Sequence, residues 1–169
     1  MTTADVLSRT RLFQPLSDDQ LKAVIKCGEV KRFESGQEIF KQGEQARTLY
    51  VLIDGLVRLR IKAPEELDLM AETVQQPGSV FGMAALSKSH VYNVTSRCIE
   101  GTSVFAIPSG ALKEIITRDP SVGVEVMAEL AQLYSNRLNS TRAALTNLFK
   151  IYRSQTQKSE IFDVYDEAG

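Results

Sequence analysis

The residues with the clearest chemical potential lie in one segment, 82–98, with the sequence GMAALSKSHVYNVTSRC. The segment opens with a glycine and small apolar residues and also holds hydroxyl, imidazole and basic side chains. Lys88 and His90 in the segment, or Arg97 near its end, could supply part of the positive charge that a bound anion needs. On a strand, Arg97 would share a face with Thr95, which gives it a route inward. The alternative for each of these basic residues is a solvated side chain.

Metal and nucleophile chemistry have little support in the rest of the chain. One histidine and two cysteines, Cys27 and Cys98, without CxxC spacing do not predict a zinc site, a disulfide framework or a cupin-type metal enzyme. A nucleophile elbow, a Walker-type loop and a dinucleotide fingerprint are also absent from the sequence. We therefore expect a non-enzymatic protein without a cofactor.

The composition indicates one globular domain with an appendage. The chain has 169 residues, of which 43% are hydrophobic and 24% charged, and its net charge is −1. Without a basic footprint, bare nucleic acid and an anionic membrane are not expected partners. The first residues lack the apolar core of a signal peptide, and no run approaches the roughly 20 apolar residues of a membrane span. We expect a cytoplasmic protein.

A capped helix is the first element that the sequence predicts. Ser17 can cap it, Gln20 occupies the return position of a capping box, and Asp18 and Asp19 lie near its positive end. Gly28 ends it. The apolar residues between recur at helical spacing, so one face of this helix can pack on a larger core.

From Glu29 to about Pro108, short β-branched and aromatic runs are separated by Gly or Pro, which is typical of an antiparallel β-sandwich or barrel. The sequence TLYVLIDGLVRLRIK predicts two strands joined as a hairpin by a two-residue turn at Asp54–Gly55. Further strands are predicted over Glu29–Phe33, Gln37–Phe40, Asp68–Val74, Tyr92–Cys98 and Thr102–Ile107.

Helical spacing returns in a short segment, 111–117, and in a long helix that Asp119–Pro120 opens. The predicted organisation is a β-roll domain over 1–118, a helix of about 45 to 50 Å over 119–153 and a polar, acidic-ended tail over 154–169. One stripe of residues runs along the helix at spacings of three and four: Met127, Leu130, Tyr134, Leu138, Thr141, Leu145, Leu148 and Tyr152. The stripe could pack on its own domain. Its length favours a parallel homodimer, with one extra residue disturbing a heptad-like seam.

The order of these elements resembles the cyclic nucleotide-binding domain family, which includes the catabolite activator type of bacterial regulator. The resemblance covers roughly residues 12–138. It implies a mainly β, α+β fold: an antiparallel jelly-roll β-barrel flanked by an N-terminal helix and a long C-terminal helix. It rests on spaced residues of the family pattern, namely Phe33, Gly36, Ile39, Phe40, Gly43, Ala46, Leu49, Tyr50, Gly55, Val57, Pro77, Gly78, Phe81, Gly82, Ala85, Leu86, Thr95, Glu100 and Pro120.

The resemblance also implies a ligand site. In the family, a short helix after the Phe-Gly pair points N–H groups at a cyclic phosphate, an arginine clamps the phosphate, and a glutamate after the glycine binds the ribose. Here Met83 stands at the glutamate position and, with the loop aligned without gaps, Tyr92 stands at the arginine position. The implied ligand-binding residues are Phe81, Gly82, Met83, Ala84, Ala85, Tyr92, Asn93, Val94 and Thr95, and on the long helix Asn136, Arg137, Ser140 and Thr141 lie where relatives close over the purine.

Both departures weaken the expected binding of the family ligand. A hydrogen bond to a charged group contributes about 1.5 to 3 kcal/mol, and about 1.4 kcal/mol corresponds to a tenfold change in affinity. Without both partners, cyclic AMP and cyclic GMP are expected to bind weakly or not at all. If the protein still senses a small molecule, the ligand would act by favouring one setting of the loop and long helix.

Three alternatives remain open at this stage. Haem sensing occurs among relatives of the fold, and His90 with a cysteine could serve as ligands. Many relatives carry a helix-turn-helix domain after the long helix, but the short acidic segment after Tyr152 is too small for one, so no direct DNA binding is expected. The protein could also act through a regulatory protein partner, or as a dimeric scaffold whose pocket Met83 and Tyr92 fill.

Overall fold

The computed structural model describes residues 2–62 and 68–166, and in these ranges it describes the side chains except at 68–71, 148, 151 and 154–166. The chain divides into two compact units, Met1–Ala131 and Gln132–Gly169. The first unit contains every strand that the structure describes, and the second consists of the later part of one long helix.

Short helices begin the first unit. The predicted capped helix is confirmed as α2 (Asp18–Cys27), where the Ser17 and Gln20 side chains form a capping box. An additional helix, α1 (Thr3–Arg9), precedes it and was not predicted, although Thr2 and Asp5 form the same kind of box there. A 3-10 turn, η1 (Arg11–Phe13), joins the two helices.

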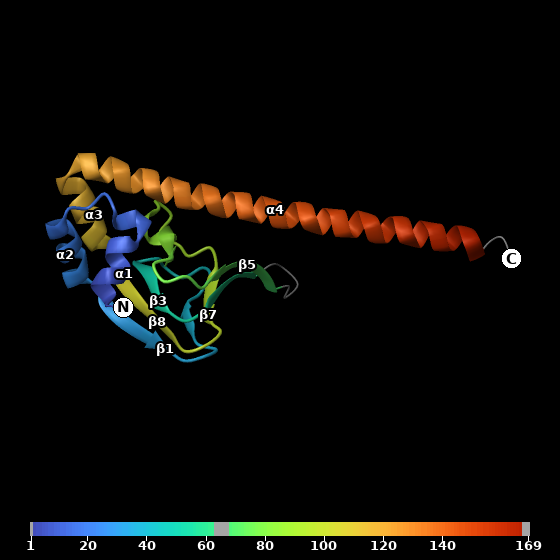
Figure 1. Ribbon diagram of the computed structural model, residues 1–169, viewed down its shortest axis with the longest axis horizontal. Coiled ribbons are helices and arrows are strands. Elements are labelled where there is room, and N and C mark those ends of the chain that lie inside the picture. Colours follow the sequence, from blue (N-terminus) through green and yellow to red (C-terminus); the bar gives the residue numbers. More distant parts are fainter. Residues whose placement is uncertain (1, 63–67, 167–169) are drawn as a thin grey trace. The chain divides into compact units, whose positions relative to one another are not determined.

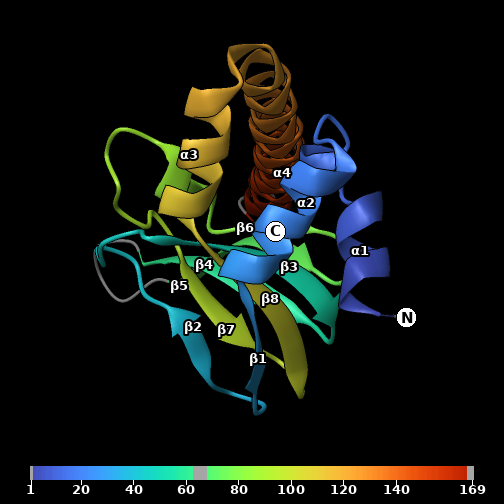
Figure 2. The same ribbon diagram turned by 90° about the vertical axis from the view of Figure 1, so that its left-hand side faces the viewer.

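The strands form two four-stranded antiparallel sheets, which Figures 1 and 2 show with their labels. In one sheet the order is β1 (Glu29–Phe33), β8 (Thr102–Pro108), β3 (Thr48–Asp54) and β6 (Val80–Phe81). In the other the order is β2 (Glu38–Phe40), β7 (Thr95–Cys98), β4 (Val57–Lys62) and β5 (Asp68–Val74). The predicted strands are therefore present, with small shifts at their ends.

The jelly-roll fold is confirmed, but the predicted barrel is not closed. Strands β1 and β6 end one sheet, β2 and β5 end the other, and no ladder joins the two sheets among the residues that the structure describes. The sheets are held instead by side chains between them. The buried residues of this interior cluster are all uncharged and come from both sheets and from the segments between strands: Phe40, Ala46, Tyr50, Leu52, Val57, Leu59, Val74, Phe81, Ala85, Tyr92, Cys98, Val104 and Ala106.

The predicted hairpin at Asp54–Gly55 is wrong, because β3 and β4 belong to different sheets. A turn does occur there, since Gly55 has a φ of +103°. A Cβ on Gly55 would lie 2.7 Å from the Cα of Thr102, so the turn packs against the start of β8. The chain passes from one sheet to the other at this point, which buries Leu52 and Val57 on facing inner surfaces. A turn dipeptide favours a local chain reversal, but tertiary packing decides which strands pair.

Two helices follow the last strand. Helix α3 (Ser109–Arg118) contains the predicted short segment, and α4 (Pro120–Asp166) begins at the predicted proline. Asp119 caps α4 by accepting a bond from the N–H of Val122 at 3.3 Å. Helices α1, α2 and α3 lie on the same side of the sheets (Figure 2).

The predicted end of the long helix is also wrong. Helix α4 continues through residues 154–166, which were assigned to a polar tail. The physical reason is composition, because this segment contains no Gly or Pro and includes the good helix formers Gln, Lys and Glu.

Candidate functional site

The predicted loop begins where β6 ends, at a sharp turn. Gly82 has a φ of +73° and leads into a 3-10 helix, η3 (Met83–Leu86). A Cβ on Gly82 would lie 3.0 Å from Cδ2 of Tyr50 and 3.1 Å from the carbonyl oxygen of Thr48. Both the backbone angle and the close packing therefore favour glycine here, which explains the residue at the start of the loop.

Tyr92 points into the space between the sheets, and its side chain is 4% exposed. Its hydroxyl donates to the carbonyl oxygen of Thr48 at 2.7 Å and accepts from the N–H of the same residue at 3.3 Å. Burial, with a smaller contribution from Tyr50, raises the pKa of the Tyr92 hydroxyl above its ordinary value of 10.0. Tyr92 is thus a neutral hydrogen-bonding residue at the position where the resemblance implies a phosphate-binding arginine.

Aromatic rings surround Tyr92 in the interior cluster. Its ring centroid lies 3.9 Å from that of Phe40, with an angle of 17° between the planes. Phe40 in turn lies 5.6 Å from Tyr50, and Tyr50 lies 5.4 Å from Phe81. Offset aromatic pairs of this kind add about 0.5 to 1.5 kcal/mol each beyond their burial. The four rings give the roll a packed apolar interior.

Backbone bonds hold the segment before β7 in place. The N–H of Gly43 donates to the carbonyl oxygen of Tyr92 at 2.8 Å, and the N–H of Tyr92 donates to the carbonyl oxygen of Glu44 at 3.0 Å. Gln45 and Val91 form an isolated bridge beside them. The strand predicted from Tyr92 begins only at Thr95. The backbone of Tyr92 is instead held by its two hydrogen bonds to Gly43 and Glu44.

The other predicted loop residues are mostly apolar or already bonded. Met83 is 1% exposed and Ala85 is fully buried, whereas Ala84 and Val94 pack partly buried against the interior cluster and Asn93 is exposed. These positions bring no charge to the interior.

Hydroxyl groups on β7 accept hydrogen bonds from backbone N–H groups in and just after β2. The Oγ1 atom of Thr95 accepts a hydrogen bond from the N–H of Gln42 at 3.0 Å. The Oγ atom of Ser96, a residue that the sequence analysis missed, accepts one from the N–H of Phe40 at 3.1 Å. The alternation of faces along a strand could have identified Ser96, because it shares the inner face with Cys98.

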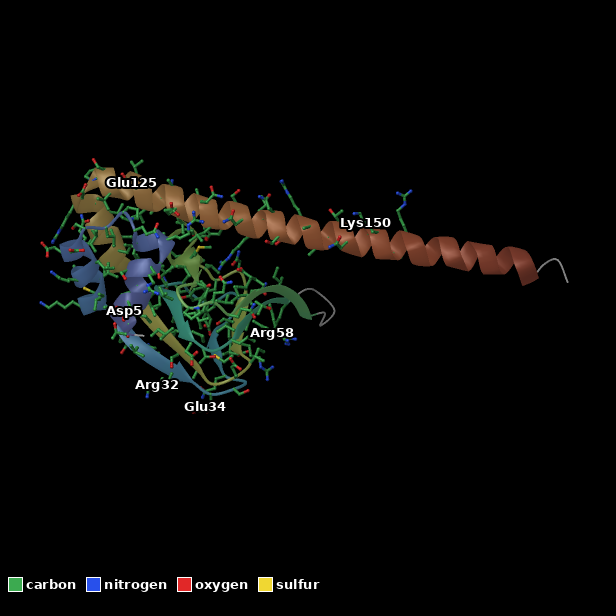
Figure 3. The ribbon with its side chains drawn as sticks, viewed as in Figure 1. Asp5, Arg32, Glu34, Arg58, Glu125 and Lys150 are labelled. Atoms are coloured by element: carbon green, nitrogen blue, oxygen red, sulfur yellow. The ribbon has the colours of Figure 1, made fainter. Side chains whose placement is uncertain are left out.

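The three basic residues that could restore charge do not gather in the interior. Lys88 is exposed. Arg97 is exposed on the outer face of its sheet, opposite Arg58 of β4, which Figure 3 labels. The expected inward route for Arg97 is not taken, because Ser96 and Cys98 occupy the inner face of β7. His90 contacts Lys113 of α3, with Nζ 3.3 Å from Nε2, a contact that sequence spacing could not reveal.

The predicted helix residues divide between the two units. In the first unit, Leu130 is 8% exposed and Met127 is 38% exposed. In the second unit, Tyr134, Leu138 and Leu145 are exposed along α4. The side chain of Leu148 lies outside the described residues.

The polar residues predicted on α4 bond within their own helix. The hydroxyl of Ser140 donates to the carbonyl oxygen of Asn136 at 3.1 Å, and that of Thr141 donates to the carbonyl oxygen of Arg137 at 3.0 Å. Side chains that bond one turn back along a helix keep a local partner whether or not a ligand is present.

Metal-binding clusters and membrane-spanning helices are absent from the part of the chain that the structure describes. No group of three or more His, Cys, Asp and Glu side chains there could hold a metal ion. No helix within the described ranges is both long and apolar enough to span a bilayer.

Known proteins share the fold of this chain. The family model of the cyclic nucleotide-binding domain matches residues 30–119. The chain is 24% identical over 144 residues to the CRP-like cAMP-activated global transcriptional regulator of Mycobacterium tuberculosis; the match covers 85% of this chain and 62% of that regulator. The chain thus spans less than two thirds of that relative.

Solved structures show the same fold. A protein from Geobacter metallireducens GS-15 is 29% identical with a TM-score of 0.70, and the match covers 82% of this chain and 99% of that one. The sensor domain of the transcriptional regulator DNR from Pseudomonas aeruginosa is 23% identical with a TM-score of 0.70, and the match covers 80% and 90% of the two chains.

Proposed function

Because the chain belongs to the cyclic nucleotide-binding domain family, we propose that it is a non-enzymatic regulatory domain whose interior binds cyclic AMP and cyclic GMP weakly or not at all. One observation carries this proposal. Tyr92, at the position of the family's phosphate-binding arginine, lies inside the roll on the ring of Phe40 and bonds the backbone of Thr48. A cyclic phosphate in this place would meet aromatic rings instead of a cation.

The energetic argument rests on desolvation. A phosphate loses its hydration when it enters a pocket, and a positive side chain usually offsets that cost. The interior cluster offers only uncharged side chains among its described members. Met83 likewise replaces the carboxylate expected for the ribose with a buried thioether. Losing two charge-assisted bonds of about 1.5 to 3 kcal/mol each weakens affinity by about a hundredfold or more.

A ligand-independent scaffold is the second candidate function, and the packed interior supports it. The ring of Phe40 contacts those of Tyr50, Phe81 and Tyr92, and the ring of Tyr50 stacks on that of Phe81. These rings fill the interior of the roll with packed apolar groups, so the fold does not need a bound ligand to fill it. In this form the domain would regulate a protein partner through its surface. Native mass spectrometry distinguishes the two functions, since a sensor purified with its ligand retains a small molecule and a scaffold does not.

We also propose that α4 forms a parallel homodimer. The residues of the apolar stripe follow an uninterrupted heptad when Val124 is added and Ala131 replaces Leu130 in the series, with spacings that alternate between three and four. Leu130 packs in the first unit instead, and Val124, at the start of the series, is 70% exposed. The proposed seam contains Val124, Met127, Ala131, Tyr134, Leu138, Thr141, Leu145, Leu148 and Tyr152.

A reversion experiment tests the proposed loss of nucleotide binding. The variant Tyr92→Arg with Met83→Glu restores the two side chains of the family pattern, and cyclic AMP binding is measured by calorimetry beside the unaltered protein. The variant should bind at least about tenfold more tightly, because one charge-assisted bond alone supplies that factor. A variant that unfolds cooperatively but binds no better than the unaltered protein would contradict the proposal.

A further inference from the structure

A contact between two basic side chains lies outside the packed interior. The Nζ atom of Lys113, on α3, is 3.3 Å from Nε2 and 3.5 Å from Nδ1 of His90. The contact is partly buried. It brings the loop between η3 and β7 against a helix that lies 23 residues further along the chain.

The backbone at His90 is held in a conformation that few side chains adopt. Its φ is +47°, and it is the one non-glycine residue with a positive φ in the described part of the chain. The carbonyl oxygen of His90 accepts from the N–H of the buried Ala46 at 2.7 Å. Backbone outliers of this kind are concentrated at ligand sites, where the surrounding structure supports their cost.

The positive charge at this contact is not balanced by nearby acids. Among the described residues, no carboxylate lies within ion-pair distance of Lys113. The adjacent Glu114 pairs with Arg118, and Glu44 accepts from the N–H of Lys41. Lys88 adds a further cation to the same loop. Lysine side chains on both elements, Lys88 on the loop and Lys113 on α3, therefore favour a positive potential around this contact.

Hydrogen-bond donors also remain available at this place. A lysine ammonium group has three N–H donors, and one bond to an imidazole nitrogen uses a single one. The neutral imidazole that accepts from Lys113 keeps one N–H donor on its other nitrogen. The hydroxyl groups just before His90 do not add to this set, because Ser87 donates to the carbonyl oxygen of Ala84 at 2.8 Å and the Ser89 hydroxyl, 2.9 Å away, is left to donate to Ser87. An oxyanion is the ligand that such a set of donors suits.

We propose that His90 and Lys113 form a binding site for a phosphate monoester or a similar doubly charged oxyanion, between the loop and α3. This site is separate from the interior where the family's ligand binds, and it does not rest on the proposed function. Bound anion would be held by the Lys113 ammonium and the His90 imidazole and would tie the loop to α3. Because α3 leads directly into α4, this site would connect anion binding to the long helix.

The test uses proton NMR of the full chain, because His90 is its single histidine and its imidazole proton signal needs no assignment. Inorganic phosphate is titrated at constant pH and constant ionic strength against chloride. The site predicts a saturable shift of the signal. The variant Lys113→Met should lower the phosphate affinity at least tenfold. Lys22→Met, on the exposed surface of α2, is the matched control and should keep the affinity unchanged.

Adenosine 5′-monophosphate and cyclic AMP complete the experiment. The monoester should shift the His90 signal in the same way as inorganic phosphate, whereas the singly charged cyclic diester should do so less. A shift that is linear in phosphate, or one that persists unchanged in Lys113→Met, would overturn the site and leave a lysine–histidine hydrogen bond only. Saturable cyclic AMP binding that survives Lys113→Met would instead contradict the proposed function and leave this site untouched.

Discussion

Tyr92 stacks on Phe40 in the middle of the roll, with ring centroids 3.9 Å apart and planes 17° from parallel. The pair joins the loop before β7 to strand β2, and the Tyr92 hydroxyl joins the same loop to Thr48 at the start of β3. One side chain thus connects both sheets.

Removing the Tyr92 hydroxyl should cost stability without changing the fold. In Tyr92→Phe, the carbonyl oxygen and the N–H of Thr48 both lose a partly buried partner. We expect the free energy of unfolding to fall by about 1 to 2 kcal/mol, and by about 3 to 5 kcal/mol in Tyr92→Ala, which also leaves a cavity. Urea denaturation checks both values. Equal stability of Tyr92→Phe and the unaltered protein would show that the bond contributes nothing.

The same hydroxyl should make stability depend on alkaline pH. Burial raises the pKa of Tyr92 in the folded protein, while the unfolded residue ionises near pH 10. Above that pH the unfolded state loses a proton that the folded state keeps, so the stability that Tyr92 contributes below pH 10 is lost as the pH rises toward the folded pKa. The free energy of unfolding, measured by denaturation between about pH 9 and 11, should fall more steeply in the unaltered protein than in Tyr92→Phe. Parallel curves for the two proteins would be inconsistent with a raised pKa.

Glycine substitutions provide a matched pair that tests the turn at the start of the loop. In Gly82→Ala the alanine would keep the backbone φ of +73°, and its Cβ would lie 3.0 Å from Cδ2 of Tyr50. We expect a loss of about 1 to 2 kcal/mol in unfolding free energy. In Gly110→Ala, within α3, the Cβ meets open space, so the helix should gain about 0.5 to 1 kcal/mol. Thermal denaturation of both variants should therefore give shifts of opposite sign.

The proposed dimer can be tested at exposed positions of α4. Leu138→Glu combined with Leu145→Glu should convert dimers into monomers, because both side chains lie on the proposed seam and are half exposed in the single chain. Val30→Glu, at an exposed position on β1, is the control and should leave the mass unchanged. Light scattering gives the mass of each protein. A dimer that persists in the double variant would exclude α4 as the seam.

Leu130 is unsuitable for that experiment. The sequence places it in the apolar stripe, but the structure buries it in the first unit with Val126 one turn earlier on the helix. A charged residue there would destabilise the fold itself, so a monomer could not be attributed to a lost interface. Spacing along a helix identifies an apolar stripe, but it does not distinguish the part that packs on its own domain from the part that faces another chain.

Local signals in the sequence predicted most of the elements. Three of these signals depend on residues within one helical turn, and all three occur as expected. They are the capping box at Ser17, the acidic residues Asp18 and Asp19 beside it, and the start of α4 at Asp119–Pro120. Pairing of β3 was not predictable in this way, because its partners β8 and β6 lie far along the chain. The Asp54–Gly55 dipeptide specifies a turn. Burial of Leu52 and Val57 between the sheets then favours placing β3 and β4 in different sheets over pairing them in one.

Part of the site could be predicted and part could not. A scaffold whose pocket Met83 and Tyr92 fill is one alternative that the sequence leaves open; the structure buries both side chains, and the filled pocket itself stays a prediction. The contact between His90 and Lys113 joins two elements whose approach depends on the whole fold, so spacing gave no signal for it. For Arg97 the predicted alternation of faces along β7 is correct, but the predicted direction is wrong. The face that Arg97 shares with Thr95 is the outer face of the sheet, so its side chain does not enter the interior.

Calorimetry of the unaltered protein with cyclic AMP and cyclic GMP tests the central claim most directly. The protein is titrated at micromolar concentration, after native mass spectrometry has established whether it carries a small molecule. The aromatic interior predicts no saturable heat with either nucleotide up to about 100 µM. A dissociation constant below about 1 µM for either nucleotide would contradict it, because Tyr92 would then have to leave Phe40 at little cost.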